Sequence, residues 1–518
     1  MKYFLGIDAG TNGVKAIIIG ENGYLAGMGY EEYNMITPKY HYAEEDPAEW
    51  WAACKKAVHR AVLSSDVGDL IESIGITGQM LATTCLDENL ETIGNCIIWL
   101  DQRATREKAW IEKNIGVEHF LPITANHPLP GFWAPKLMWM QKNTPEDYQK
   151  IYKILFSKDY LRFKMTNEIS TEVTDASGSF LFDVPRREWS DELFSLCGID
   201  KSIVPERVLE SSDVAGYLQP DIAAELGLRS GIPVVAGCGD QQAGGIGNGV
   251  IEAGMVSSTI GASGVVFAAM DEPIADKLPR AALSMCHAQK EKWCLFGCTL
   301  GAGGSFKWLR DIMFPTEKKE LATLHKDVYN YMSELAQNAN PGSEGLCFLP
   351  YLNGERTPYS DPNASGVFFG ITYRHRREEI CRAVMEGVTF SLRDTLEILR
   401  EYGIPVGEIR AAGGGAKSRL WRQIQADIFN ASILSTSIEE APACGMALMA
   451  AVGCGAFASL KDACHSIIKI TDEIKPRPAN VEIYEEYFET YRSLYPLLKD
   501  TYARQAELVI KNSERYKI

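Results

Sequence analysis

The sequence has few histidines and lacks closely spaced pairs of cysteines. Its 518 residues include 8 histidines, none at HExxH or HxxxH spacing, and 13 cysteines, none of which forms a CxxC pair. These absences argue against a structural zinc site. Because an odd number of cysteines in so long a chain favours reduced thiols, the sequence predicts a cytoplasmic protein.

Positive charge and strongly apolar segments are scarce as well. Lys and Arg number 52 against 68 Asp and Glu, which gives a net charge of −16. Because nucleic-acid backbones are bound through Lys and Arg, we expect no nucleic-acid partner. The two long uncharged stretches, 253–270 and 441–460, are rich in Gly, Ala, Ser and Cys. We therefore expect no membrane segment, and the start of the chain becomes acidic and Gly-rich too soon for a signal peptide.

Short apolar runs joined by glycine turns are what the sequence does have. Residues 3–8 and 14–19 read as strands around Gly10-Thr11-Asn12-Gly13, and residues 255–269 repeat this pattern around Gly261-Ala262-Ser263-Gly264. The repeat predicts two related α/β halves, with chance similarity of glycine turns as the alternative. We expect domains at 1–250 and 251–460, followed by a helical tail at 461–518.

The first turn carries groups suited to a nucleotide phosphate. Asp8 ends the first predicted strand, and Thr11 and Lys15 follow within seven residues. A carboxylate at a strand end can hold hydrated Mg²⁺, while the turn N–H groups, the hydroxyl and the Lys charge can face phosphate oxygens. The Walker A pattern is absent, and an ordinary hairpin turn is the alternative interpretation.

Three other motifs place polar residues or glycines at the ends of predicted strands. Asp240 follows the apolar run 232–236, where α/β folds place ligand sites, and a helix N-cap is its alternative role. Gly413-Gly414-Gly415 lies between a predicted strand and a helix, which allows a ligand close to the backbone or simply makes a connection. Trp99 and Asp101-Gln102-Arg103 suit a polyol, or a capped helix start.

The order and spacing of these motifs together resemble the FGGY carbohydrate kinase family, in the sugar-kinase/actin-type ATPase superfamily. The resemblance extends from about residue 3 to 460. Its most specific part is Gly366-Val367-Phe368-Phe369-Gly370-Ile371 followed by 379–386. Residues 349–358, Leu-Pro-Tyr-Leu-Asn-Gly-Glu-Arg-Thr-Pro, are most similar to the xylulokinases of that family.

The resemblance implies a fold and an activity. We expect two ribonuclease-H-like α/β domains with a cleft between them, sugar held mainly by the N-terminal half and ATP with Mg²⁺ mainly by the C-terminal half. The implied reaction is ATP-dependent phosphorylation of a sugar hydroxyl, with D-xylulose converted to D-xylulose 5-phosphate. Another ketose, a tetritol or, least of all, glycerol are the alternatives, and a sugar-binding protein without catalysis is a remote one. Family members are often homodimers.

The resemblance also assigns roles residue by residue. Asp240 matches the general base, and Asp8 the acid near the metal and phosphates, so both are candidate Mg²⁺ ligands. The candidate sugar-binding residues are Gln79, Met80, Leu81, Trp99, Asp101, Arg103, Trp133 and Gln241. The candidate ATP-binding residues are Thr11, Asn12, Lys15, Gly261, Ala262, Ser263, Gly301, Gly304, Gly414, Gly415 and Arg419.

Three positions depart from the family pattern. Leu81 stands where xylulokinases usually have His, which removes an imidazole expected to touch the sugar. Trp133 stands where the first family signature has Ser, Thr or Pro, and we expect its indole beside the sugar. Ala262 replaces a usual Thr on the nucleotide side, where Ser263 could compensate. These departures put the identity of the sugar in doubt.

Overall fold

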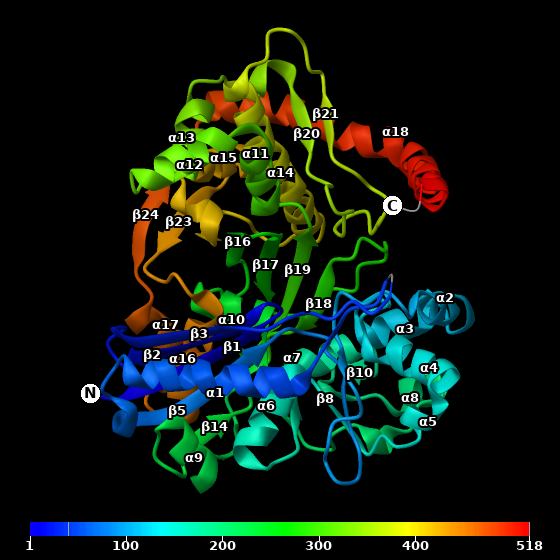
Figure 1. The fold of residues 1–518 in the computed structure, drawn as a ribbon, viewed down its shortest axis with the longest axis vertical. Helices are drawn as coiled ribbons and strands as arrows, with labels where there is room; N and C mark the ends of the chain where they lie inside the picture. The colour runs from blue at the N-terminus through cyan, green and yellow to red at the C-terminus, as the bar shows by residue number, and fades with distance from the viewer. Residues whose placement is uncertain (40, 517–518) are drawn as a thin grey trace.

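The computed structural model describes residues 1–39 and 41–516 of the chain. Two lobes lie one above the other, and each is built around its own β-sheet (Figure 1). The N-terminal half forms the lower lobe in this view, and most of the C-terminal half forms the upper lobe.

The sheet of the lower lobe begins with an antiparallel meander. β1 (Tyr3–Gly10) runs antiparallel to β2 (Gly13–Gly20) and parallel to β5 (Ile71–Gly78), with Asp8 opposite Lys15 on one side and Thr77 on the other. The strand order is β13 (Val214–Tyr217), β14 (Pro233–Val235), β5 (Ile71–Gly78), β1 (Tyr3–Gly10), β2 (Gly13–Gly20) and β3 (Leu25–Glu32), and β15 (Cys238–Gly239) also pairs with β5.

The sheet of the upper lobe repeats this plan. β16 (Val256–Ile260) and β17 (Gly264–Met270) form the hairpin, β19 (Trp293–Thr299) pairs antiparallel with β17, and β22 (Glu408–Ala412) runs parallel to β16. The strand order is β18 (Leu283–Cys286), β19 (Trp293–Thr299), β17 (Gly264–Met270), β16 (Val256–Ile260), β22 (Glu408–Ala412), β23 (Ser432–Thr436) and β24 (Ile470–Ile474). In both sheets a hairpin thus pairs antiparallel with a third strand on one side and parallel with a later strand on the other, as expected for two halves of similar architecture.

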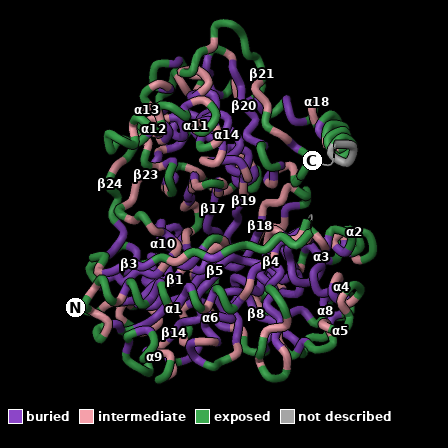
Figure 2. The backbone as a smooth tube through the Cα atoms, in the orientation of Figure 1, coloured by how far each residue is buried: buried purple, intermediate pink, exposed green. Residues whose placement is uncertain are grey.

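Helices cover both faces of the lower sheet, which explains why β1 carries few polar side chains apart from Asp8. α1 (Pro47–Leu63) packs against β2 and β3, whereas α16 (Ala441–Gly453) packs against β1 and β5. A side chain at Gly6 would overlap the carbonyl of Ala443, so glycine permits the close approach of this small-residue helix. Figure 2 shows buried backbone concentrated along β1 and β5.

The chain returns to the lower lobe after it has built most of the upper one. Both α16 and α17 (Leu460–Ile467) share a buried apolar cluster with Phe4, Ile17 and Ile19 of the lower sheet. The upper lobe therefore does not coincide with the predicted unit 251–460. Within the uncharged stretch 441–460, residues of α16 are buried because this helix packs against β1, β5 and α10.

The predicted helical tail contains a strand. β24 pairs antiparallel with β23, with Ile474 opposite Ile433, and it completes the edge of the upper sheet. α18 (Pro478–Tyr516) then runs along the upper lobe, and residues 517–518 lie outside the described residues. Of the helices in the described ranges, none is both long and apolar enough to span a bilayer.

The remaining elements surround the two sheets. The lower lobe adds the helices α2 (Thr105–Asn114), α3 (Val117–Thr124), α4 (Trp133–Asn143), α5 (Pro145–Tyr148), α6 (Ser157–Thr166), α7 (Val173–Ala176), α8 (Asp191–Cys197), α9 (Pro220–Leu226) and α10 (Asp240–Gly247). Its short strands are β4 (Glu44–Glu45), β6 (Thr84–Leu86), β7 (Cys96–Ile97), β8 (Lys153–Leu155), β9 (Thr171–Glu172), β10 (Phe182–Asp183), β11 (Glu188–Trp189) and β12 (Val208–Leu209). The upper lobe adds α11 (Gly303–Met313), α12 (Pro315–Thr323), α13 (Val328–Gln337), α14 (Arg377–Glu401), α15 (Arg419–Phe429), β20 (Cys347–Leu349) and β21 (Val367–Phe369).

Candidate functional site

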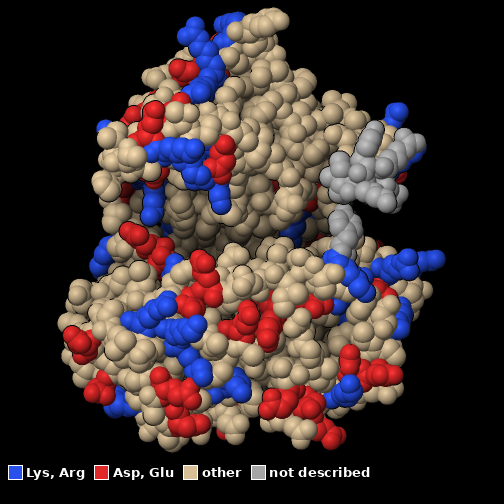
Figure 3. Space-filling view, in the orientation of Figure 1, with Lys and Arg blue, Asp and Glu red and all other residues tan. Residues whose placement is uncertain are grey.

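A cleft separates the two lobes, and the space-filling view shows the molecule hollowed there (Figure 3). A cavity of about 210 Å³ is lined from both sides of this cleft. The lower lobe contributes Thr11, Met80, Leu81, Trp99, Asp240 and Gln241. The upper lobe contributes Ser263, Val265, Leu283, Met285, Phe296, Cys298 and Arg356. This cavity, called the substrate cavity below, is large enough for a small molecule. Its wall on the side of the upper lobe is largely apolar.

Asp240 is the first residue of α10, directly after β15. The residue at the N-cap is Gly239, so the predicted alternative role of Asp240 as a capping side chain is wrong. Its carboxylate accepts a hydrogen bond from Gln241 Nε2 at 3.2 Å and lines the substrate cavity. The helix start thus presents this carboxylate to a bound molecule.

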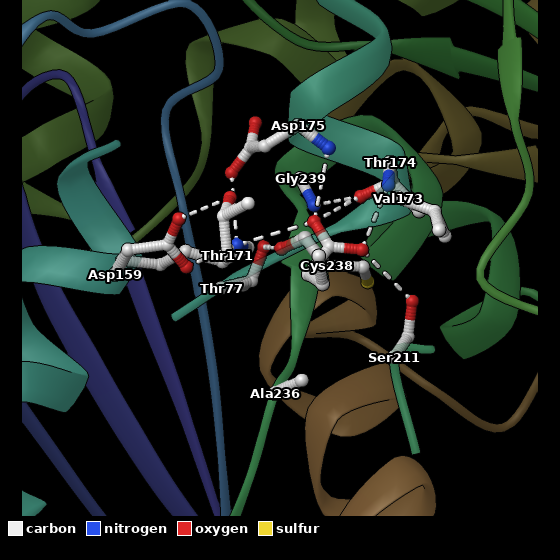
Figure 4. Close-up of polar contacts among 12 residues, drawn as sticks. Thr77, Asp159, Thr171, Val173, Thr174, Asp175, Ser211, Ala236, Cys238 and Gly239 are labelled. Atoms are coloured by element: carbon white, nitrogen blue, oxygen red, sulfur yellow. Dashed lines mark hydrogen bonds and ion pairs between the residues drawn. The ribbon is translucent and has the colours of Figure 1, made fainter. Parts of the chain in front are cut away.

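A buried polar network holds the strand that leads to Asp240 (Figure 4). Thr77 Oγ1 donates to the carbonyl of Cys238 at 2.6 Å, and the N–H of Gly239 donates to Thr174 Oγ1 at 2.9 Å. The Thr174 hydroxyl in turn donates to Glu172 Oε1 at 2.7 Å. These contacts fix β15 on both sides, and so fix where α10 begins.

The same network contains charged groups that are fully buried. Lys158 Nζ lies 2.7 Å from Asp159 Oδ1, 3.1 Å from Glu172 Oε1 and 3.1 Å from Asp175 Oδ2. Burial works against the Lys158 charge, but the three carboxylates together raise its pKa far above the usual range. Removing one partner of such a cluster would leave a buried charge uncompensated, so it is a rigid support for the site.

Asp8 lies at the end of β1, near Asp240. Its pKa is raised to about 7, first by burial and then by the Asp240 charge, against the opposing effect of Lys15. Burial likewise raises the pKa of Asp240 to about 6, opposed by hydrogen bonds from Gln241. A base with a pKa near neutrality is suited to accept a proton from a hydroxyl.

The two carboxylates also have the character of a magnesium site. Asp8 Oδ1 is buried without a hydrogen-bond partner among the described residues. No group of three or more His, Cys, Asp or Glu side chains that could hold a metal occurs in the described part of the chain. Mg²⁺ often takes only one or two protein carboxylates and completes its shell with water and phosphate oxygens, so the residues present fit this ion.

The first glycine turn joins β1 to β2 beside the cavity. Thr11 Oγ1 accepts a hydrogen bond from Trp99 Nε1 at 3.0 Å, while Asn12 is exposed at the tip of the turn. Lys15 Nζ lies 2.6 Å from Glu440 Oε2, in an ion pair that the sequence pattern did not predict. The charge of Lys15 is therefore already balanced by a residue next to α16.

A second cavity, of about 430 Å³, lies in the upper lobe and brings together the three glycine motifs. Its predicted lining residues are Gly261, Ala262, Gly304, Gly414 and Gly415. Residues that the sequence analysis missed also line it, among them Phe306, Lys307, Asp327, Tyr329, Asn330, Ser333 and Trp421. Glycine backbone on one side and aromatic rings on the other suit a nucleotide.

Six predicted nucleotide ligands lie outside this second cavity, namely Thr11, Asn12 and Lys15 of the first turn and three residues of the upper lobe. Ser263 lines the substrate cavity instead, and Gly301 lines neither of the two. The side chain of Arg419 is 76% exposed, and its Nη1 lies 3.2 Å from Asp472 Oδ2. Asp472 lies on β24 at the edge of the sheet, beside α15. Its ion pair with Arg419 therefore keeps this guanidinium at the surface.

Four predicted sugar ligands lie behind the wall of the substrate cavity and do not line it. Gln79 is buried and donates from Nε2 to Glu45 Oε2 at 2.6 Å. Arg103 pairs with Asp101 at 2.8 Å and with Glu44 at 2.6 Å. The donors of Gln79 and Arg103 are thus directed at these carboxylates and away from the cavity, although Gln79 Oε1 and Glu45 Oε1 are buried without a hydrogen-bond partner among the described residues.

The prediction for Trp133 is corrected in the same way. Its ring is 0% exposed and stacks on Phe156, with ring centroids 3.8 Å apart, while Nε1 donates to the carbonyl of Ala82 at 2.8 Å. Lys136 Nζ donates to the carbonyl of Leu81 at 2.8 Å. Residues of α4 therefore hold the backbone of the loop that carries Leu81, and the indole does not line the substrate cavity.

The upper-lobe wall of the substrate cavity was missed by the sequence analysis, apart from Ser263. Val265, Leu283, Met285, Phe296 and Cys298 come from β17, β18 and β19, and they meet only because these strands pair. Apolar residues are usual in paired strands, so the sequence of these strands does not indicate a ligand site. Arg356 was included only in the segment 349–358, which carried no assigned role.

Comparison with known proteins agrees with this architecture. The N-terminal domain of the FGGY family of carbohydrate kinases matches residues 3–247, and the C-terminal domain of that family matches residues 256–454. The xylulose kinase of Bacillus subtilis is 36% identical over 504 residues, which cover 96% of this chain and 98% of that protein.

Solved structures show the same two-lobed fold. The ligand-bound xylulose kinase of Lactobacillus acidophilus superimposes with a TM-score of 0.89 at 26% identity, covering 97% of this chain and 100% of that one. The gluconate kinase of Lactobacillus acidophilus also gives a TM-score of 0.89 at 26% identity, covering 97% of this chain and 99% of that one. With both domains matched in order and nearly the whole length aligned, the chain belongs to the FGGY family of carbohydrate kinases.

Proposed function

We propose that this protein transfers the γ-phosphoryl group of ATP to D-xylulose and releases D-xylulose 5-phosphate and ADP. The observation that carries the proposal is the position of Asp240, a carboxylate with a raised pKa that lines a cavity between the lobes. Similarity to xylulose kinases over nearly the whole chain supports the choice of sugar.

Asp240 would act as the general base. Its carboxylate takes the proton from the sugar hydroxyl while that oxygen forms a bond to the γ-phosphorus, and the bond from phosphorus to the β–γ bridging oxygen breaks. A base of this kind contributes about 10²–10⁴-fold to the rate. Positioning and charge neutralisation supply most of the rest in phosphoryl transfer.

The remaining residues would bind and orient the two substrates. Gln241, Met80, Leu81 and Trp99 surround the sugar, as the lining of the substrate cavity supports. Backbone N–H groups of the glycine turns and the hydroxyl of Thr11 face the phosphates. The aromatic side of the second cavity, with Tyr329 and Trp421, borders the adenosine.

Asp8 and Asp240 would hold Mg²⁺, directly or through water. The ion supplies neutralisation of phosphate charge when bound. The unpartnered oxygen of Asp8 and the mutual effect of the two carboxylates support this assignment. Closure of the lobes over both substrates would exclude water and so suppress hydrolysis of ATP.

A different short sugar or polyol is the second candidate. Leu81, in place of the usual His, lines the substrate cavity and presents methyl groups there. A structure named as a gluconate kinase has the same fold, so the fold by itself does not determine the substrate. Leu81 favours a substrate with fewer polar contacts at this position.

Release of ADP from Mg-ATP, measured across a panel of C3 to C7 sugars, sugar acids and polyols, tests the proposal. We expect D-xylulose to give the highest kcat/KM of the panel. Selective turnover of another compound would replace D-xylulose by the second candidate. ATP-independent sugar binding with no product from any compound would reject the kinase assignment.

We also propose that the protein works in the cytoplasm. All thirteen cysteines are free thiols and eleven of them are buried, which suits a reducing compartment. The homodimer stays a prediction, and sedimentation of the purified protein tests it.

A further inference from the structure

Arg356 is the only basic residue among those that line the substrate cavity. Within the described part of the chain, its guanidinium has no carboxylate partner and no side-chain hydrogen bond. Burial lowers its pKa, and the main opposing influence is the nearby thiol of Cys298. An Arg kept partly buried without a partner is costly, so an anion that completes the site is the natural explanation.

The neighbours of the guanidinium connect it to both glycine turns. It faces the ring of Trp99, with the ring centroid 5.8 Å away, and Trp99 Nε1 donates to Thr11 Oγ1 of the first turn. It is also near Cys298, which pairs across β17 and β19 with Val265, two residues beyond Ser263 of the second turn. An anion held by both turns would therefore meet this side chain.

The backbone of Arg356 is fixed by its neighbours. The N–H of Thr357 donates to the carbonyl of Cys298 at 3.0 Å. Glu355 accepts hydrogen bonds from Thr299 Oγ1 at 2.7 Å and from the Arg356 N–H at 2.7 Å. The Glu355 carboxylate is thus occupied by the main chain and by a hydroxyl, and it leaves the neighbouring guanidinium free.

Apart from Arg356, no basic side chain lines the cavity in which phosphoryl transfer is proposed. Its lining carboxylate is Asp240, with Asp8 nearby, and the charge of Lys15 is balanced by Glu440 at 2.6 Å. Phosphoryl transfer spreads negative charge over the equatorial oxygens, and a positioned guanidinium stabilises that charge through its fixed fork of donors.

We propose that Arg356 is a catalytic residue that binds the oxygens of the phosphoryl group during its transfer and afterwards on the product. This role rests on the proposed kinase function. In the step, the sugar oxygen bonds to the γ-phosphorus, the bond from that phosphorus to the β–γ bridging oxygen breaks, ADP leaves, and the hydroxyl proton passes to Asp240. Arg356 keeps its proton throughout and supplies only charge and hydrogen bonds.

The test compares Arg356→Gln and Arg356→Lys with Arg186→Gln, a matched loss of charge on a side chain that is 75% exposed. We expect R356Q to lower kcat by roughly 10²–10³-fold, as loss of a transition-state donor does. R356K should retain more activity than R356Q because it keeps the charge without the fork. R186Q should match the wild type.

Binding gives a second readout that needs no turnover. By calorimetry, R356Q should bind D-xylulose within about twofold of the wild type but D-xylulose 5-phosphate at least about tenfold more weakly, equivalent to roughly 1.4 kcal/mol. Near-normal kcat in R356Q, or equal weakening for sugar and sugar phosphate, would overturn the role of Arg356 alone. A wild-type protein inactive on every sugar would instead overturn the proposed function and this role with it.

Discussion

The backbone N–H of Gly239 donates a hydrogen bond to the hydroxyl of Thr174, with 2.9 Å between nitrogen and oxygen. Gly239 directly precedes Asp240, so this contact links the proposed base to the buried Lys158 cluster through Thr174 and Glu172. The position of one cavity-lining carboxylate thus depends on a network that never touches the cavity.

Thr174→Val tests this link. The substitution leaves the buried N–H of Gly239 without an acceptor, which costs about 1–3 kcal/mol of unfolding free energy. Because a small misplacement of a base is expensive, we expect kcat to fall roughly tenfold or more. Thr124→Val is the control, since Thr124 is buried in the same lobe and its hydroxyl donates to the carbonyl of Phe120 at 3.1 Å. A loss of kcat in both variants would contradict a positioning role for Thr174.

Asp240→Asn should make the ligand-free protein more stable. Burial raises the pKa of Asp240 to about 6, above its unfolded value of 3.8, so its charged form destabilises the fold at neutral pH. A neutral amide removes that cost, and after allowance for partial exposure we expect a gain of about 1–2 kcal/mol in urea unfolding at pH 8. A loss of stability in this variant would contradict a free-energy cost of burying the charged carboxylate.

Gly178→Ala should push the side chain of Leu81 into the substrate cavity and so narrow it. A methyl group at this position would overlap Leu81 Cδ2, and Leu81 lines the substrate cavity. The displaced side chain should raise KM for the sugar by about tenfold with a smaller effect on kcat, since the base is untouched. The matched control is Gly407→Ala, where an added methyl meets nothing within 4 Å. An unchanged KM would mean that Leu81 does not shape the sugar site.

His287 should make the protein less stable at mildly acidic pH. Its ring is buried, and Nε2 lies 3.0 Å from the carbonyl of Val250. Nδ1 accepts a hydrogen bond from the N–H of Gln289 at 2.8 Å, so protonation of Nδ1 would break this bond. Burial lowers its pKa from 6.5 to about 4. Between these values the unfolded chain binds a proton that the folded chain does not, so stability falls as the pH falls from 6.5 to 4, by up to roughly 3 kcal/mol.

The measurement is urea unfolding at pH 7.5 and pH 5.0 for the wild type and His287→Gln. Relative to the wild type, the variant should lose less stability on acidification, because the other titrating groups contribute equally to both proteins. His59→Gln, at an exposed position on α1, should keep the pH dependence of the wild type. An identical pH dependence in all three proteins would contradict the assignment to His287.

Local pattern was enough to predict the paired turns and the strands that carry them. The runs at 3–8 and 14–19 lie within β1 and β2, and the repeat at 255–269 largely overlaps β16 and β17. These elements could be found because period and turn chemistry are properties of neighbouring residues.

Long-range packing decided what could not be predicted. Met80, Trp99 and Asp240 do meet in one cavity, but nothing in the spacing of Trp133 shows that its ring stacks inside the lower lobe. The same applies to Arg419, whose partner Asp472 lies on a strand within the expected helical tail. Arg356 stands out only once its lack of a partner is visible in three dimensions.

The measurement that tests the account most directly is ³¹P spectroscopy of the product formed from D-xylulose and Mg-ATP, with wild type and Asp240→Asn in parallel. The account predicts a sugar 5-phosphate accumulating with ADP for the wild type, and a rate at least about 10²-fold lower for the folded variant. Near-normal product formation by Asp240→Asn would contradict Asp240 as the base. Absence of any sugar phosphate with the wild type would contradict phosphorylation of D-xylulose itself.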